Sequence, residues 1–531
     1  LKVFYTGLDE QVLEVDVGAG GTVQKNIVLT NAARMAGRTR AADGKGEVLK
    51  LEKFVVEATE QDGDSIAINE QRFSPNLKNV VAADAFGDVT EGNPGEFLKF
   101  LPGVSVDYVA ADVRSISVRG FGSAFTSVNV DGNRMASAAS SGASRSFELE
   151  QVSMNNVARI ELTKVPTPSM PADSMGGSVN LISKNAFEKD HREIKYRAYL
   201  SANSEDLTLS RTPGPKPENS YKIRPGFDVT YADPLTPNFD IVVNALRSDQ
   251  FNEQHRSRNR WEFNSGDGTA ATPYLRRYEL QDGPKETLRQ SLGINADWKV
   301  AADSVLSFGY QWNDYDSFFG NRNYTWNVGS SVRQPNYDGT FTQGRTRAGE
   351  ITGATSFRNK FGSTNHLNLD FKHYSDDLTV LAGVFYSYAT NKYRDISNGH
   401  FSNVGTRLRN LTIRFDGIQA FNPGKITALD TNGVDHTTPL LADFNLRSAR
   451  SQEYDSWDEF KGGQASVKKS LNLSVPANIQ VGVSQRSQQR DIIRRQDDYN
   501  YVGPDGSTET SDDNAAPFMD NSAAPPGARA A

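Results

Sequence analysis

The sequence predicts a mostly β protein, in which a smaller α+β domain precedes an antiparallel transmembrane β-barrel. Hydrophobic residues make up only 37% of the 531 residues and the mean hydropathy is −0.56, yet aromatic residues reach 10% and there are 44 glycines. Barrel strands alternate apolar and polar side chains, so a membrane barrel looks hydrophilic on average. From about residue 191 the sequence shows this alternation. It contains no run of about 18 apolar residues, so no transmembrane helix is expected.

The composition also excludes several classes of function. The 58 Lys and Arg against 65 Asp and Glu give a net charge of −7, which disfavours nucleic-acid binding through phosphate contacts. The chain has no cysteine, so disulfides, thiolate metal sites and cysteine nucleophiles are excluded. The six histidines form no HExxH motif.

The first 64 residues predict the end of a small β-domain, residues 1–31, followed by a linker, residues 32–64. Apolar and polar residues alternate over 12–17, and a Gly-rich turn follows. The linker is rich in Ala, Gly and charged residues. Within it, the apolar triplet 54–56 predicts a short extended segment.

Residues 65–190 predict a compact α+β domain. Asn93 is a candidate N-cap, Pro94 stands in the first turn, and Pro102-Gly103 ends a short helix. LEQVSMNNVA, starting at Leu149, predicts a second helix. Short strands are expected in SISVRGFG, SVNVDGNRM, ARIELTKV and SMGGSVNLIS.

Residues 191–531 predict the barrel portion. Nine candidate strands lie at 194–200, 227–231, 239–245, 292–298, 306–312, 367–371, 378–388, 465–467 and 479–483. Short turns alternate with long loops, which are expected at 248–289, 314–364 and 391–461. Transmembrane barrels show this alternation between periplasmic turns and extracellular loops. A soluble β-sandwich also has period-two strands, but it would not confine its long loops to every second connection.

Residues 92–184 resemble the plug of TonB-dependent outer-membrane receptors. The matching segments are GEFLKFLPGVSVD (95–107), RSISVRGFGSAFTSVNVDGNRM (114–135) and ARIELTKVPTPSMPADSMGGSVNLISK (158–184). Several motifs therefore occur in the family's order, and their amino-acid sequences are most similar to those of the subgroup that imports carbohydrates. The resemblance implies an N-terminal plug inside the lumen of a barrel in the outer membrane of a Gram-negative-type bacterium, with the plug and N-terminal segment facing the periplasm.

Two flanking segments fit the same resemblance. Residues 1–31 resemble the end of a carboxypeptidase-regulatory-like β-domain. The segment between linker and plug stands where the family has its TonB box, an extended segment that adds a strand to its partner's sheet. The box would consist of Glu52, Lys53, Phe54, Val55, Val56, Glu57 and Ala58. The implied partners are TonB with its inner-membrane ExbB-ExbD motor, outer-membrane lipid, and a small-molecule or oligosaccharide ligand.

The chain departs from the family in its number of strands. Family barrels have about 22 strands around a plugged lumen, whereas nine are counted here, and the chain ends in Ala531 rather than in a terminal aromatic residue. We therefore expect the sequence to be the N-terminal part of a longer chain.

No catalytic, metal or cofactor site is expected. The sequence lacks GxSxG, P-loop and GxGxxG motifs, and Ser178 after two glycines has no histidine in a recognisable relation to it. Asp-rich stretches near 497 and 512 lack the full EF-hand spacing.

The resemblance places two sets of candidate site residues. Arg119, Glu161 and Lys164 lie in plug strands and are expected to contact the barrel. Aromatic residues of the long loops suit sugar rings or iron-chelator catechols, although each could equally be a packing residue. These candidates are Trp261, Tyr274, Tyr278, Phe318, Phe319, Tyr324, Trp326 and Tyr337.

The expected function is energised uptake of a scarce nutrient, possibly an oligosaccharide. A receptor for a siderophore or other metal chelate is an alternative. So are a non-transporting surface binding protein, which would need no TonB box, and a transducer, which would need a signalling domain before residue 1.

Overall fold

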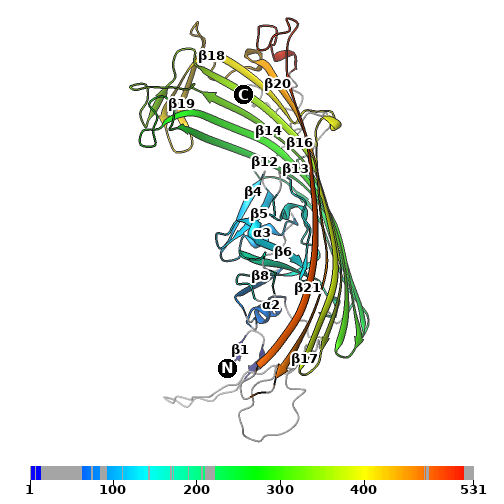
Figure 1. Ribbon diagram of the computed structural model, residues 1–531. Helices are drawn as coiled ribbons and strands as arrows, with labels where there is room; N and C mark the ends of the chain where they lie inside the picture. Colours follow the sequence, from blue (N-terminus) through cyan, green and yellow to red (C-terminus); the bar gives the residue numbers. More distant parts are fainter. Residues whose placement is uncertain are drawn as a thin grey trace, which may run out of the picture.

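In the computed structural model the chain forms a small α+β domain beside a large curved sheet (Figure 1). Apart from a few single positions within these ranges, the structure describes residues 2–5, 8–12, 63–83, 92–109, 112–140, 144–188, 191–209, 222–471 and 477–518. Within them, no helix is both long enough and apolar enough to cross a membrane. At the N-terminus, β1 (Lys2–Tyr5) pairs antiparallel with β2 (Leu8–Val12).

The α+β domain contains a five-stranded sheet and a hairpin. The sheet order is β3-β8-β9-β6-β7, and only β6 and β9 run parallel. Its strands are β3 (Lys78–Ala82), β6 (Thr126–Val130), β7 (Asn133–Arg134), β8 (Val157–Thr163) and β9 (Gly177–Ser183). The hairpin joins β4 (Val104–Val109) to β5 (Asp112–Val118). One apolar core, which includes Leu98, Val118 and Leu162, fills the domain and holds it together.

The helices of this domain are short. The expected helix after Asn93 is α3 (Gly95–Leu98), and the Asn93 side chain accepts a hydrogen bond from the Gly95 amide at 2.9 Å. The helix expected from Leu149 is wrong: only a 3₁₀ turn, η2 (Leu149–Gln151), forms there, because the following residues hydrogen-bond to the large sheet. A helix not predicted from the sequence, α2 (Gly63–Arg72), precedes β3. The other 3₁₀ turns are η1 (Ser123–Phe125), η3 (Ala186–Glu188), η4 (Ile396–Asn398), η5 (Leu441–Asp443) and η6 (Ala516–Phe518).

The large sheet, called the wall below, has twelve strands among the described residues. Nine of them coincide with the nine expected strands, which confirms those predictions. They are β10 (Glu193–Ser201), β11 (Arg224–Thr236), β12 (Phe239–Glu262), β13 (Tyr274–Ala301), β14 (Ser304–Asn327), β16 (Gly349–Tyr374), β17 (Leu378–Arg394), β20 (Asn445–Leu471) and β21 (Ala477–Asn500). The remaining three form a small group at the upper end: β15 (Phe341–Gln343), β18 (Asn403–Ile418) and β19 (Pro423–Leu429).

The two faces of the wall differ in chemistry. In β12 the apolar residues Ile241 and Val243 point outward, whereas Asp240 and Asn244 on either side of this pair are buried against the α+β domain. The same alternation in the neighbouring strands leaves an apolar belt on the outer face, where Val384 is 57% exposed and Val481 is 70% exposed. Side chains that are apolar and exposed on one face of a sheet, opposite a polar packed face, are what a lipid-facing barrel wall requires.

The strands are much longer than the sequence predicted. Most of the segments expected as the loops 248–289, 314–364 and 391–461 belong to strands, and β14 pairs with β16 without a register break from Ser304 to Asn327. At about 3.3 Å per residue, strands of this length extend well beyond a hydrocarbon core of about 30 Å. The expected loops were wrong because both faces of the upper strands are polar, so the period-two signal stops while the hydrogen-bond ladder continues.

Candidate functional site between the plug and the wall

The α+β domain contacts the inner face of the wall through a segment of small residues. Ala136, Ala138 and Ala139 are fully or almost fully buried there. The Ala136 amide donates to Ser387 Oγ at 3.0 Å, and the Ser137 amide donates to the Asp458 carboxylate at 3.1 Å. Side chains no larger than a methyl or hydroxymethyl group let this backbone approach the strands closely enough to hydrogen-bond to them.

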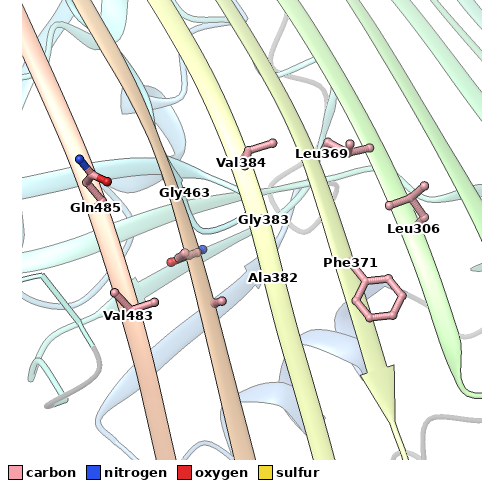
Figure 2. A pocket seen from close by; sticks show the side chains of 11 residues that line it. Leu306, Leu369, Phe371, Ala382, Gly383, Val384, Gly463, Val483 and Gln485 are labelled. Atoms are coloured by element: carbon pink, nitrogen blue, oxygen red, sulfur yellow. The ribbon is translucent and has the colours of Figure 1, made fainter.

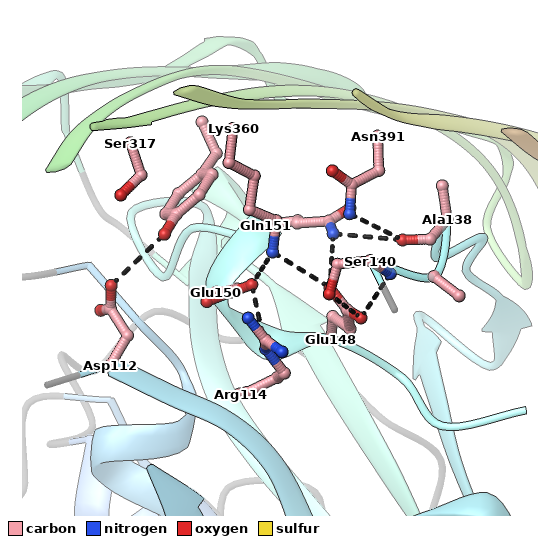
Figure 3. A network of polar contacts seen from close by, with 12 residues as sticks. Asp112, Arg114, Ala138, Ser140, Glu148, Glu150, Gln151, Ser317, Lys360 and Asn391 are labelled. Carbon is pink, nitrogen blue, oxygen red and sulfur yellow. Dashed lines mark hydrogen bonds and ion pairs between the residues drawn. The ribbon is translucent and has the colours of Figure 1, made fainter. Parts of the chain in front are cut away.

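A buried carboxylate of the domain pairs with two cations of the wall. Asp112, at the start of β5, contacts Lys285 Nζ and lies 2.5 Å from Arg289 Nη2, and all three residues are at most 3% exposed. The Tyr315 hydroxyl lies 3.5 Å from the same carboxylate (Figure 3). Burial alone would raise the pKa of Asp112, but the charges of Arg289 and Lys285 outweigh it, so this pKa lies well below its ordinary value.

A second buried ion cluster lies nearby, and it also pairs carboxylates of the domain with a cation of the wall (Figure 3). Lys360 of β16 contacts Glu150 and lies 3.2 Å from Glu148, both in the α+β domain. Arg114 approaches Glu150 at 3.3 Å. Burial raises the pKa of Glu148, but the charges of Lys360 and Arg114 more than offset this, so its pKa is lowered. The domain thus supplies the carboxylates and the wall supplies most of the cations.

Amide side chains continue the contact toward the lower end of the wall. Asn156 Oδ1 accepts hydrogen bonds from Asn244 and Asn295, each at 2.8 Å. Gly293 lies against the same side chain, and a Cβ built there would stand 2.6 Å from Asn156 Cγ. These amide contacts therefore help to hold the domain against the wall.

The residues expected to contact the barrel lie inside the α+β domain instead. Glu161 pairs with Lys78 at 2.7 Å. The Arg119 guanidinium donates to the carbonyls of Met175 and Gly176 at 3.5 and 3.4 Å. For Lys164 the described contact is its backbone amide, which donates to the Leu77 carbonyl at 2.9 Å. Contact of these three residues with the barrel therefore stays a prediction, whereas Asp112, Glu148 and Glu150 make charged contacts with the described wall.

Most of the aromatic residues expected to bind a ligand pack against one another. Four belong to one buried cluster and two more lie against it: Tyr274, Tyr278, Trp326 and Tyr337, with Trp261 and Tyr324. This cluster holds the upper strands to β18 and β19. That any of these six side chains binds a ligand stays a prediction, and their packing supports the structural alternative.

Phe318 and Phe319 lie on opposite faces of β14. Phe318 shares the outer face with Leu306 and Phe308, and its ring stacks on Phe357 with the centroids 5.7 Å apart. Phe319 points to the inner face and is half-buried. Of the four predicted aromatics in β14, Phe319 is the one that the strand's alternation places on the side of the α+β domain. The expected TonB box, residues 52–58, lies outside the described residues.

A hollow of about 510 Å³ lies on the outer face of the wall (Figure 2). Leu369, Phe371, Val384 and Val483 surround a floor formed at Gly463. These side chains belong to the apolar belt, so the hollow faces away from the α+β domain and does not connect to the buried ion clusters.

Comparison with protein families identifies the α+β domain. Residues 70–178 match the TonB-dependent Receptor Plug Domain family. Among solved structures, the chain is similar to the ferric enterobactin receptor PfeA of Pseudomonas aeruginosa, with 12% identity, a TM-score of 0.32, and coverage of 75% of this chain and 64% of that one. Comparison with curated protein sequences found no match.

Two further structures show similar values. The hemophore receptor HasR of Serratia marcescens has 9% identity and a TM-score of 0.30, with coverage of 80% of this chain and 61% of that one. The siderophore receptor PiuA of Acinetobacter baumannii has 10% identity and a TM-score of 0.27, with coverage of 79% and 62%. The chain thus spans less than two thirds of the length of each of these three receptors.

The α+β domain is therefore a receptor plug, and the large sheet beside it is a barrel-type wall. Residues 70–178 therefore carry a plug of the TonB-dependent receptor type, as the motifs predicted. Receptors of this family are outer-membrane proteins that carry the plug in the barrel lumen. The match is to a receptor domain and not to an enzyme, which confirms that expectation.

Proposed function

We propose that this receptor imports a scarce nutrient across the outer membrane with energy delivered through TonB. The observation that carries the proposal is the plug held against the inner wall by two buried ion clusters, around Asp112 and around Lys360. Removing one partner of a buried ion pair costs about 3–5 kcal/mol. A plug attached in this way blocks the lumen at equilibrium, so passage of a ligand requires work.

The proposal assigns a direction to the molecule. The short turns 237–238, 302–303 and 375–377 face the periplasm, and the long upper strands extend outside the cell. Residues 52–58 form the TonB box and recruit TonB with its ExbB-ExbD motor from the periplasmic side. In this proposal the chain consists of four parts: the β-domain at 1–31, the linker at 32–64, the plug at 65–190 and the barrel portion at 191–531.

The test separates energised transport from binding. Val55→Pro removes a backbone donor and opposes strand addition, so uptake should be lost while binding at the cell surface persists. Val55→Thr is the matched control, because it keeps the β-branched side chain and the amide, and it should transport normally. Both activities are measured in parallel in cells that carry the full-length receptor, at equal surface levels.

Two results would contradict the proposal. Normal uptake by Val55→Pro would show that residues 52–58 are not the box. Surface binding with no uptake in the unmodified receptor, whatever the state of the energy supply, would favour a non-transporting surface binding protein.

A further inference from the structure

We propose that the hollow on the outer face of the wall binds one phosphate-bearing lipid of the outer leaflet, with an acyl chain in the hollow and the phosphate at Lys461. The hollow is continuous with the apolar belt that the wall presents to lipid (Figure 2). Such a site lies outside the lumen. Of the proposed function it requires only the orientation of the wall, with the long upper strands outside the cell.

Small residues in two neighbouring strands form the floor of the hollow. Ala382 of β17 pairs with Ala465 of β20, and Val384 pairs with Gly463. A Cβ built at Gly463 would stand 3.3 Å from Val384 Cγ1, so a longer side chain there would occupy the space. The larger apolar side chains that line the hollow are Leu306, Leu369, Phe371, Val384 and Val483. An empty space of about 510 Å³ would deprive these side chains of dispersion contacts, and a flexible hydrocarbon chain restores them.

A polar cluster lies directly above the hollow on the same face. Tyr386 of β17 and Lys461 of β20 form the next outward pair above Val384 and Gly463. Lys461 Nζ donates to Glu459 Oε1 at 2.9 Å, and the Tyr386 hydroxyl donates to Glu459 Oε2 at 3.1 Å. The Lys461 side chain is 54% exposed and an ammonium has three donors, so it can bind a phosphate oxygen while it keeps its bond to Glu459.

Gln485 of β21 supplies a polar group at the upper margin of the hollow. It pairs with Gly463, and the same cross-strand row continues through Val384, Leu369 and Phe308. These last three side chains are apolar, whereas Gln485 is exposed and ends in an amide. An amide both donates and accepts hydrogen bonds, so it suits the polar linkage that joins an acyl chain to its head group.

From top to bottom the surface changes from charged groups to an amide to apolar side chains, which is the order of groups in a phosphate-bearing lipid. The Lys461 ammonium forms charge-assisted hydrogen bonds with phosphate oxygens. Glu459 accepts from hydroxyl or ammonium groups, so a head group that also carries such donors fits best. A second barrel packed on this face would have to bury Lys461 and Glu459 at a desolvation cost, whereas a lipid leaves them at the water interface.

Lipid retention by the full-length receptor tests the site. The receptor is purified in detergent, and native mass spectrometry counts the bound copies of three probes with acyl chains of equal length: a diphosphoryl glycolipid, a phosphatidylethanolamine and a phosphate-free diacylglycerol. At least one phosphate-bearing probe should bind as one copy per receptor, about tenfold or more tightly than the diacylglycerol, because it gains charge-assisted hydrogen bonds. Which of the two is retained identifies the head group.

Two variants each remove one half of the site. Gly463→Leu fills the hollow and Lys461→Gln removes the charge, and each should weaken retention by about tenfold or more. Lys469→Gln is the matched control for charge, because Lys469 lies on the same face of β20 at its lower end, where it pairs with Asp377. Ala296→Leu, on the outer face of β13 and outside the hollow, is the control for volume. Both controls should retain lipid as the unmodified receptor does.

Three results would overturn the lipid site: no phosphate-bearing probe is retained, the diacylglycerol is retained equally, or the two variants behave like their controls. Lys461→Gln changes an exposed side chain, so it decides the matter even if Gly463→Leu does not fold. Retention by the purified receptor needs neither a nutrient nor TonB, so its failure and a failure of energised uptake are separate results.

Discussion

At the scale of the residue, Asp112 attaches the plug to the wall through buried ion pairs. Its partners Lys285 and Arg289 are 173 and 177 positions away in the chain, and all three are buried. No local pattern links such distant charges, and residues 248–289 looked like a polar loop, so sequence reasoning missed the pair. The sequence signal for this pair was spacing. Lys285 and Arg289 are an even number of residues apart from Ser291 and Asn295, so all four side chains lie on the same face of one strand.

Asp112→Asn is expected to loosen the plug by about 3–5 kcal/mol, because it leaves two buried cations without their carboxylate. Hydrogen exchange of the full-length receptor should show plug amides in β6 and β9 exchanging roughly 100-fold faster or more. Asp107→Asn is the control, since this exposed carboxylate contacts only Ser115 in the described structure and its loss should change little. Equal protection in the two variants would mean that the ion cluster does not hold the plug.

At the scale of the element, contact with lipid determined which parts of the strands could be predicted from the sequence. The nine strands were found because each must present apolar side chains on one face across the membrane, as Val380, Ala382 and Val384 do in β17. Above the apolar belt, the outward side chains no longer need to be apolar. The outward residues Asp314 and Asp316 in β14 are as polar as the inward Asn313 and Ser317, so the sequence signal vanished while the strand continued.

Val384→Arg tests the belt. Val384 is exposed on the outer face, and an arginine near the bilayer midplane should lower the free energy of unfolding by about 2–4 kcal/mol. Gln464→Arg is the matched control at the same height, because Gln464 pairs with Gly383 and belongs to the inner face. The receptor is refolded reversibly into lipid and titrated with denaturant, and equal losses in the two variants would show that the outer face does not meet lipid.

At the scale of the whole molecule, order along the chain and the plug motifs were enough to predict a plug followed by a barrel wall. The lining of the lumen was not predictable in the same way. Aromatic residues were chosen for their chemistry, but most of them pack in a buried cluster, whereas the accessible groups facing the lumen are arginines and amides such as Arg256 and Gln281. Which face a side chain occupies depends on register across several strands, and composition does not reveal it.

The account depends most on the wall crossing the outer membrane with its long strands outside the cell. The chain has no cysteine, so a single introduced thiol reports its own position. Thr340→Cys introduces a thiol at the upper end and Leu235→Cys introduces one near the end of β11, beside the turn 237–238; both native side chains are exposed. A membrane-impermeant maleimide should label Thr340→Cys on intact cells and Leu235→Cys only after the outer membrane is opened. Labelling of Leu235→Cys but not Thr340→Cys on intact cells would contradict the account.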